Sequence, residues 1–263
     1  MKTYTTKITD YGYKERVTIY EKEIVYDEPK ETSTFRQRYE EMTEDKKVAS
    51  DRRRIRYYKN AIAELIEIAL MNRDLNVAIT LTFKKTVTSY DLALAEWQLF
   101  LKRLRHIVKE PLKYICVWEY QQQRSKNLGL DKGGVFHFHC LMNIGFIEHS
   151  ILEKTWGKGY VWIDKLSSDD KLEHAIRYTT KYCVKEIISR IENNEDVRGQ
   201  RFYFTSNNLL KPTTTILESK LYIEDIIFEH MEDIIKDVSY DVKNELGMIV
   251  NHIEYVEYKK KGK

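Results

Sequence analysis

Two histidines separated by one bulky apolar residue, His137-Phe138-His139, form the pattern in this chain that best supports chemistry. They lie in an apolar run that follows two glycines and is typical of a β-strand. Successive side chains of a strand point to opposite faces, so both imidazoles emerge on one face and Phe138 on the other. Two imidazoles on a rigid strand could bind a metal ion, although the same pattern also occurs on exposed strand faces.

Glu119 is the best candidate for a third ligand. It lies in an apolar strand predicted over residues 114–120, on the same side as Ile115 and Val117. A carboxylate in such a strand is costly unless a cation pairs with it, and the alternative is an edge carboxylate that faces water. Two imidazoles and one carboxylate leave coordination positions open, unlike a closed structural zinc site. This ligand set suits Mn²⁺ or Mg²⁺, which would act as a Lewis acid on a phosphate.

Two tyrosines and two lysines recur on the last predicted helix of the core. Tyr178 and Tyr182 are four residues apart, which places them on one helix face, and Lys181 and Lys185 each follow a tyrosine by three residues. A phenol with a pKa near ~10 is a poor nucleophile at neutral pH, so a nearby ammonium group or metal ion is what nucleophilic attack would need. The alternative is a helix with packed tyrosines and solvated lysines.

These residues belong to a predicted element order βαββαβ followed by one helix. The strands are predicted over 77–83, 114–120, 135–140 and 159–163, and the helices over 90–106, 147–154 and 168–190. This order suits an α+β fold of the split βαβ type, similar to ferredoxin and RRM-like folds, in which helices pack on one face of an antiparallel sheet. We expect the other face to be open, with His137 and His139 on it.

Composition and charge limit the possible partners. The 263 residues, 42% of them hydrophobic, allow one sizeable core, and a net charge of +3 gives only weak support for a polyanionic partner. Basic residues cluster, however, at the start of a long amphipathic helix predicted to end near residue 70. This basic cluster, a candidate DNA-binding surface or an ordinary solvated helix face, consists of Arg52, Arg53, Arg54, Arg56 and Lys59.

The three cysteines, Cys116, Cys140 and Cys183, show no paired metal spacing and fit core positions in a reducing cytoplasm. The first residues lack the apolar stretch of a signal peptide, and no apolar run reaches membrane-spanning length. We therefore expect a cytoplasmic protein with no membrane partner. No P-loop motif occurs, so we expect no helicase of that type in the chain.

Three ordered motifs between about residues 75 and 190 resemble those of the HUH endonucleases, and among them the rolling-circle replication initiators of small phages and plasmids. Residues 79–83 are similar to the first motif, and His137-Phe138-His139 is similar to the histidine-hydrophobic-histidine motif. The segment from Tyr178 to Lys185 is similar to the tyrosine-lysine helix. Their order, spacing and predicted elements agree with that family.

The resemblance implies a metal-dependent tyrosine endonuclease and strand transferase that acts at a specific site in single-stranded DNA. A metal ion on His137, His139 and Glu119 would polarise the scissile phosphate, and a tyrosine would attack it to form a 5′-phosphotyrosine bond. That bond would conserve the energy for rejoining, so no nucleotide would be consumed.

The two tyrosines resemble the pair of phage-type initiators, which act in alternation. Residues 182–185 also resemble the single-tyrosine motif of eukaryotic circular-virus initiators, so Tyr182 is the better candidate if only one acts. Lys185 matches the family's lysine better than Lys181. His174, four residues before Tyr178, could reach the site or be a plain surface residue.

Other residues leave alternatives open. Trp156 and Trp162 could stack on unpaired bases, although core packing is the usual role of tryptophan. We assign Thr80 and Thr82 to the sheet rather than to catalysis.

The resemblance also implies the partners: single-stranded DNA at a replication origin, and a helicase and a polymerase supplied by a prokaryotic host. A relaxase or a transposase would use the same chemistry. Two alternatives from other classes are a non-catalytic single-stranded nucleic-acid binding module and a metal-dependent hydrolase without a covalent intermediate.

We divide the chain into an N-terminal hairpin with a charged linker (1–50), an HUH nuclease domain (51–215), and a C-terminal helix with a basic tail (216–263). The hairpin is predicted from alternating residues around Val17 and a turn at Gly12. The C-terminal helix is predicted from apolar and acidic residues that recur between 221 and 236.

Overall fold

The computed structural model describes the chain except for residues 1, 27–37, 122–134, 193–200, 245 and 261–263, and except for the side chains of residues 120, 121, 182–184, 186, 187 and 192. It confirms an α+β fold, with two antiparallel five-stranded sheets. The chain divides into two compact units: a core unit, Tyr39–Leu210, and a terminal unit, Met1–Arg38 with Lys211–Lys263.

The core unit holds one sheet with strand order β6-β3-β5-β4-β7. Its elements are η1 (Tyr39–Glu41), α1 (Glu44–Met71), β3 (Val77–Thr82), α2 (Tyr90–Leu104), β4 (Tyr114–Gln121), β5 (Val135–Met142), α4 (His149–Trp156), β6 (Val161–Lys165), α5 (Asp169–Glu192) and β7 (Tyr203–Thr205). The predicted strands and helices of this region are thus present in the predicted order.

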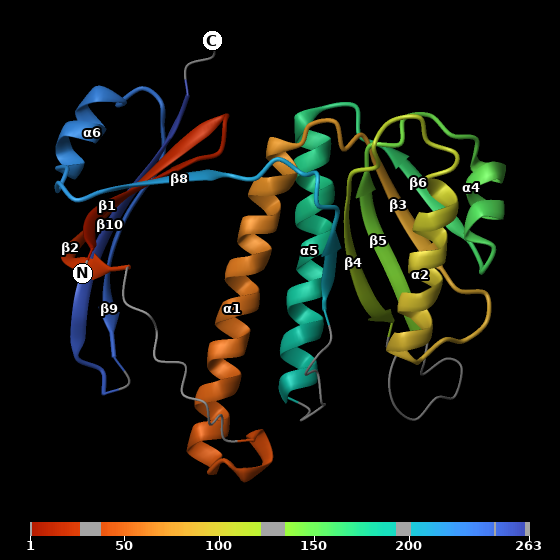
Figure 1. The fold of residues 1–263 in the computed structure, drawn as a ribbon, viewed down its shortest axis with the longest axis horizontal. Helices are drawn as coiled ribbons and strands as arrows, with labels where there is room; N and C mark the ends of the chain where they lie inside the picture. Colours follow the sequence, from red (N-terminus) through yellow and green to blue (C-terminus); the bar gives the residue numbers. More distant parts are fainter. Residues whose placement is uncertain (1, 27–37, 122–134, 193–200, 245, 261–263) are drawn as a thin grey trace. The chain divides into compact units, whose positions relative to one another are not determined.

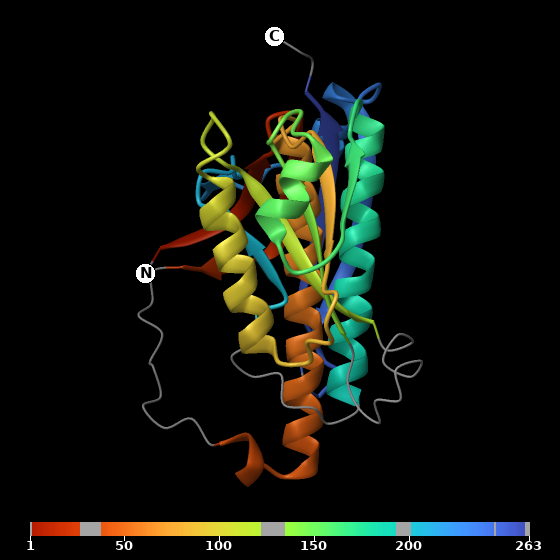
Figure 2. The same ribbon diagram turned by 90° about the vertical axis from the view of Figure 1, so that its right-hand side faces the viewer.

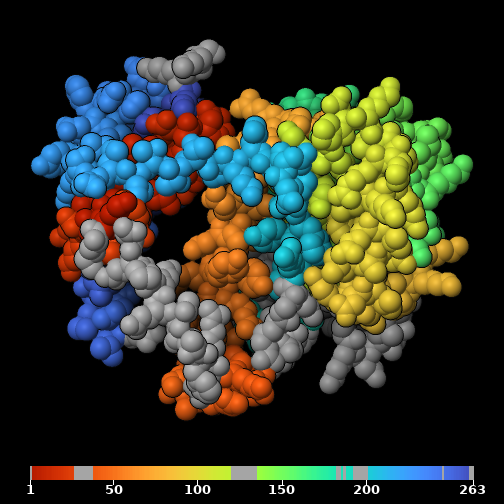
Figure 3. All heavy atoms as spheres, viewed as in Figure 1, coloured from red at the N-terminus to blue at the C-terminus, as the bar shows by residue number. Residues whose placement is uncertain are grey.

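Helices α2 and α4 cover one face of this sheet through aromatic side chains (Figures 1 and 3). The Phe138 ring on β5 stacks on Trp97 of α2, with ring centroids 5.4 Å apart, and lies 6.4 Å from Trp156 of α4. All three side chains are at most 1% exposed. Ser89 caps α2 as expected, because its side-chain oxygen accepts a hydrogen bond from the Leu92 N–H. Phe138 therefore fixes which face of β5 is turned to the helices.

Helix α5 lies over the opposite face, so the expectation of helices on one face and an open histidine face is wrong (Figures 1 and 2). Leu172 and Ile176 on α5 are buried in the same hydrophobic core as the sheet. The helix is amphipathic, and the second face of the sheet is the apolar surface on which that stripe is removed from water. The histidine face is therefore partly covered.

Helix α1 packs against α5 rather than forming a separate arm. Its inward stripe, Ile55, Ile62, Leu65 and Ala69, follows the helical repeat, which confirms the long amphipathic helix. The helix begins at Glu44, about two turns before the basic cluster. In the part of the chain that is described, no helix has both the length and the apolar character to cross a bilayer.

The terminal unit is a second sheet, with strand order β8-β1-β2-β10-β9. Its elements are β1 (Thr3–Asp10), β2 (Lys14–Val25), β8 (Thr213–Leu217), α6 (Ile223–Glu229), β9 (Ile234–Lys243) and β10 (Ile249–Lys259). The predicted hairpin is present as β1 and β2, and it pairs with β8 and β10 from the other end of the chain. The structure thus groups the two terminal segments into one unit, unlike the three-part division drawn from the sequence.

The predicted helix over residues 221–236 is wrong in its second half. Helix α6 ends at Glu229, and the chain enters β9 at Ile234. Residues of β9 form a ladder of backbone pairs with β10, whose partners are distant from the helix and are set by tertiary structure. This non-local pairing overrides the local helical pattern.

Candidate functional site

The register of three neighbouring strands gathers the predicted metal ligands on the face covered by α5. In the β4–β5 pair Glu119 lies opposite His137, and in the β3–β5 pair Thr80 lies opposite His139 and Thr82 opposite His137. Directly opposed residues of antiparallel strands point to the same side of the sheet. The two histidines and Glu119 therefore share one face, as the alternation in the sequence predicts.

His139 is held by two hydrogen bonds. Its Nε2 lies 2.9 Å from the Glu119 Oε2, and its Nδ1 lies 3.2 Å from the Thr80 Oγ1. In the neutral tautomer with the proton on Nε2, the ring donates to Glu119 and the Thr80 hydroxyl donates to Nδ1. The side chains of His139 and Glu119 are 12% and 17% exposed, so both are shielded from water but reachable.

The third predicted ligand, His137, is 3% exposed. The described residues contain no group of three or more His, Cys, Asp or Glu side chains arranged to hold a metal ion. Two of the three predicted ligands, His139 and Glu119, are therefore in contact, while His137 shares their face without completing a three-ligand cluster.

Helix α5 places Tyr178 beside this face. Tyr178 lines a pocket together with His139 and Thr80, is 51% exposed, and stacks on His174 with ring centroids 6.5 Å apart. Tyr182 lies one turn further along α5, and its side chain is outside the described residues. Lys181 and Lys185 are exposed. Of the two predicted nucleophiles, Tyr178 is the one that the structure locates relative to His139.

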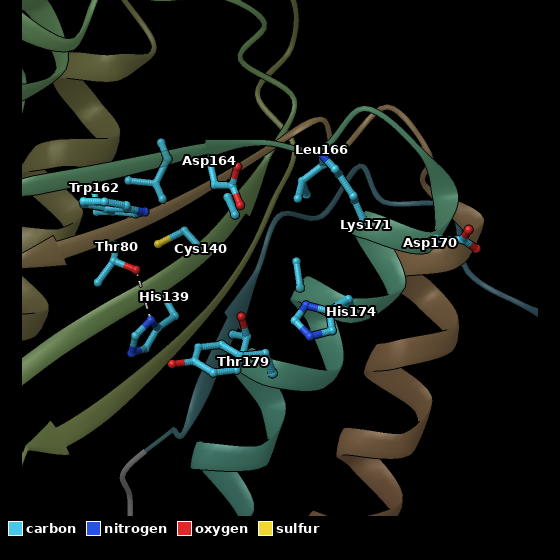
Figure 4. Close-up of a pocket in the computed structure, with 14 residues that line it drawn as sticks. Thr80, His139, Cys140, Trp162, Asp164, Leu166, Asp170, Lys171, His174 and Thr179 are labelled. Carbon is cyan, nitrogen blue, oxygen red and sulfur yellow. Dashed lines mark hydrogen bonds between the residues drawn. The ribbon is translucent and has the colours of Figure 1, made fainter.

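The pocket has a volume of about 520 Å³ and lies between the sheet and the first half of α5 (Figure 4). Figure 4 shows Thr80, His139, Trp162 and Asp164 on its sheet side, and Lys171, His174 and Thr179 on its helix side. Trp162 is 73% exposed, whereas Trp156 is fully buried and donates from its indole N–H to the Thr82 carbonyl oxygen. The two tryptophans thus differ, and only Trp156 has the core position expected for this residue type.

Two residues of the pocket, Thr80 and Asp164, are not identified as functional by the sequence patterns, which also do not distinguish Trp162 from Trp156. All three pocket residues lie on the histidine face only because β3 and β6 pair in the register Thr80↔Trp162. The alternation within β6 is the signal that could have placed Trp162 and Asp164 on one face together. Which face that is depends on strand pairing, which the sequence does not state.

The basic cluster lies on α1 and contributes nothing to the described lining of the pocket. Arg52, Arg53, Arg56 and Lys59 are exposed, and Arg54 is half-buried. The cluster is thus a cationic helix surface within the core unit, separate from the histidine face.

Residues 76–187 match the family model of a replication-associated protein of the ORF2 type. The matched stretch includes β3, β4 and β5 and ends within α5, so it contains the histidines, Glu119 and both tyrosines. Searches of curated proteins and of solved structures gave no match. This part of the chain is therefore similar to a family of replication-associated proteins.

Proposed function

We propose that this chain is an HUH-type endonuclease and strand transferase that cuts single-stranded DNA at a specific site and initiates rolling-circle replication. The observation that carries the proposal is the meeting of Glu119, His139 and Tyr178 around one face of the sheet, within the stretch similar to replication-associated proteins. A phenol that lines the same pocket as an imidazole–carboxylate pair is what a tyrosine nuclease requires.

His137, His139 and Glu119 would hold a divalent cation, Mn²⁺ or Mg²⁺, since two imidazoles and a carboxylate are suitable donors and stand on one face. Metal binding would have to bring the His137 ring toward the other two side chains, because the three do not form a cluster as they lie. The cation would supply Lewis acidity at the scissile phosphate. Thr80 would accept a hydrogen bond from Nδ1–H of His139 and so leave Nε2 as the ligand atom.

A tyrosine oxygen of α5 would attack the phosphorus atom and form a phosphotyrosine bond to the 5′ side of the break. The P–O3′ bond breaks, the phenol loses its proton, and the 3′ oxygen leaves as a hydroxyl group. One phosphodiester replaces another, so no nucleotide is needed. Tyr178 and Tyr182 would act in alternation, and Lys181 and Lys185 would orient the phosphate or favour the phenolate.

Single-stranded DNA at a replication origin is the proposed substrate, and the basic cluster on α1 would bind its backbone. A host helicase and polymerase in a prokaryotic cytoplasm would complete replication. Relaxases and transposases share this chemistry, so the sequence context of the cut would separate these roles.

The test is covalent trapping. The full chain is incubated with a randomised single-stranded DNA library and Mn²⁺, and SDS-resistant protein–DNA adducts are isolated and sequenced. We expect adducts that disappear with EDTA and in the Tyr178→Phe/Tyr182→Phe double variant, but persist in Tyr222→Phe, a matched change at an exposed tyrosine of the terminal unit.

Cutting without an adduct in the wild type would support the hydrolase alternative. Binding without cutting would support the non-catalytic binding module. Adducts at the wild-type level in the double variant would refute both tyrosines as nucleophiles.

A further inference from the structure

We infer that the pocket beside His139 is a subsite for one unpaired guanine next to the scissile phosphate, in which Trp162 is the stacking surface and Asp164 reads the edge of the base. The inference rests on the proposed function, because the base belongs to the strand that the site would cut. It adds a sequence-reading element to the site that the nicking chemistry itself does not require.

Trp162 is the exception among the four tryptophans. Trp97, Trp118 and Trp156 are at most 1% exposed, whereas Trp162 is 73% exposed on the edge strand β6. A largely exposed indole that lines a pocket offers a flat apolar face, and such faces stack on unpaired bases.

The strand register puts this indole at a suitable distance from the proposed chemistry. Trp162 pairs with Thr80, and Thr80 pairs with His139, so the three residues form one row across β6, β3 and β5. Two strand spacings separate the ends of that row, or roughly 10 Å. That span is comparable with the reach of a nucleotide from its phosphate to its base. A phosphate at His139 therefore leaves its neighbouring base near Trp162.

The space and its polar groups fit a purine nucleotide. A volume of about 520 Å³ lies within the range of ordinary ligand sites, and the opening at the sheet edge lets a strand enter and leave. Asp164 stands two residues after Trp162 on the same face of β6, and Lys171 and His174 face it from α5 (Figure 4). Among the described residues, the side chains of Asp164 and Lys171 have no hydrogen bond or ion pair that would occupy them.

Guanine matches this arrangement better than the other bases. Its Watson–Crick edge carries two adjacent donors, N1–H and the N2 amino group, which one carboxylate can accept together, and an O6 acceptor for a lysine ammonium group. Adenine places an amino donor where guanine has O6, and cytosine offers the carboxylate a single donor and a smaller stacking face. The carboxylate of Asp164 and the ammonium group of Lys171 therefore favour guanine.

The first experiment measures binding without cutting. Heptamers of thymidine with one central dG, dA or dC are titrated in EDTA against the full chain, and tryptophan fluorescence is followed. We expect the dG heptamer to bind most tightly and to quench the fluorescence of Trp162. Trp162→Ala should weaken its binding, followed by anisotropy of a labelled heptamer, about 5- to 100-fold, the loss of one base–aromatic stack.

Matched variants separate stacking from edge recognition. Trp162→Phe should retain much of the affinity, and Asp164→Asn should remove the preference for dG over dA and dC. Phe146→Ala, at an aromatic residue that is 96% exposed and outside the pocket lining, should change neither. Equal binding of the three heptamers to the wild type, or an unchanged dG preference in Asp164→Asn, would overturn the guanine subsite.

The second readout is the base preference of the trapped adducts. A guanine next to the cut in wild-type adducts that becomes random in Asp164→Asn supports the subsite. Adducts with the same base composition in wild type and Asp164→Asn refute the subsite while the nicking function stands. Guanine-dependent binding with no adduct in any protein refutes the nicking function while the subsite stands.

Discussion

Replacing Thr80 with valine should weaken divalent-cation binding about tenfold while leaving the fold intact. Valine keeps the β-branched shape that suits β3 and removes only the hydroxyl that contacts the His139 Nδ1 at 3.2 Å. A neutral hydrogen bond contributes about 0.5–1.5 kcal/mol, or roughly 2- to 13-fold in affinity, and loss of a hydrogen-bond partner of a metal-bound histidine costs about 10- to 100-fold. The contact is long, so the expected effect lies where these two ranges meet.

The assay is calorimetric titration of the full chain with Mn²⁺. Thr82→Val is the matched control, because Thr82 lies on the same face of β3 but its hydroxyl donates to the Tyr160 carbonyl oxygen instead of contacting His139. Thermal unfolding without metal should show less than about 1 kcal/mol difference between the two variants. Equal Mn²⁺ affinity of Thr80→Val and Thr82→Val would refute the argument that Thr80 orients a metal-binding histidine.

Two further predictions concern stability. Trp156→Ala should lower the free energy of urea unfolding by about 3–5 kcal/mol because the indole is fully buried, whereas Trp162→Ala should change it by less than about 0.5 kcal/mol; similar losses would contradict their different burial. In the terminal unit, burial would raise the pKa of Glu257, but the hydrogen bond from Lys14 and the Arg16 guanidinium hold that pKa below its ordinary value of 4.5. The ionised carboxylate therefore stabilises the folded state above that pH, and the contribution is lost as pH falls through the lowered pKa. Glu257→Gln should destabilise the protein by about 3 kcal/mol at pH 7, and thermal unfolding should show this deficit narrowing toward pH 3; a deficit independent of pH would exclude the ion pairs as its cause.

Sequence patterns predicted the local elements of the core unit because those patterns report a single strand or helix at a time. The alternation of His137, Phe138 and His139 determines that the imidazoles share a face, and the structure confirms it through the Phe138 contacts with α2 and α4. The helical repeat of α5 likewise places Tyr178 and Tyr182 on the same helix. The resemblance to replication initiators rests on the same local patterns, and it coincides with the matched stretch 76–187.

Long-range pairing decided what local patterns did not. No local pattern gives a reason for α5 to cover the histidine face, for β10 to join the N-terminal hairpin, or for residues after Glu229 to leave the helix. Each depends on backbone and apolar partners that are distant in the chain.

The candidate site divides in the same way. The sequence by itself determined its chemistry, because residue type and short spacing supply the imidazoles, the carboxylate and the phenols. Only the tertiary structure decided that Thr80 orients His139 and that Trp162 and Asp164 share the pocket with Tyr178. The physical reason is that the register between β3, β5 and β6 depends on how three distant segments bury their apolar faces together.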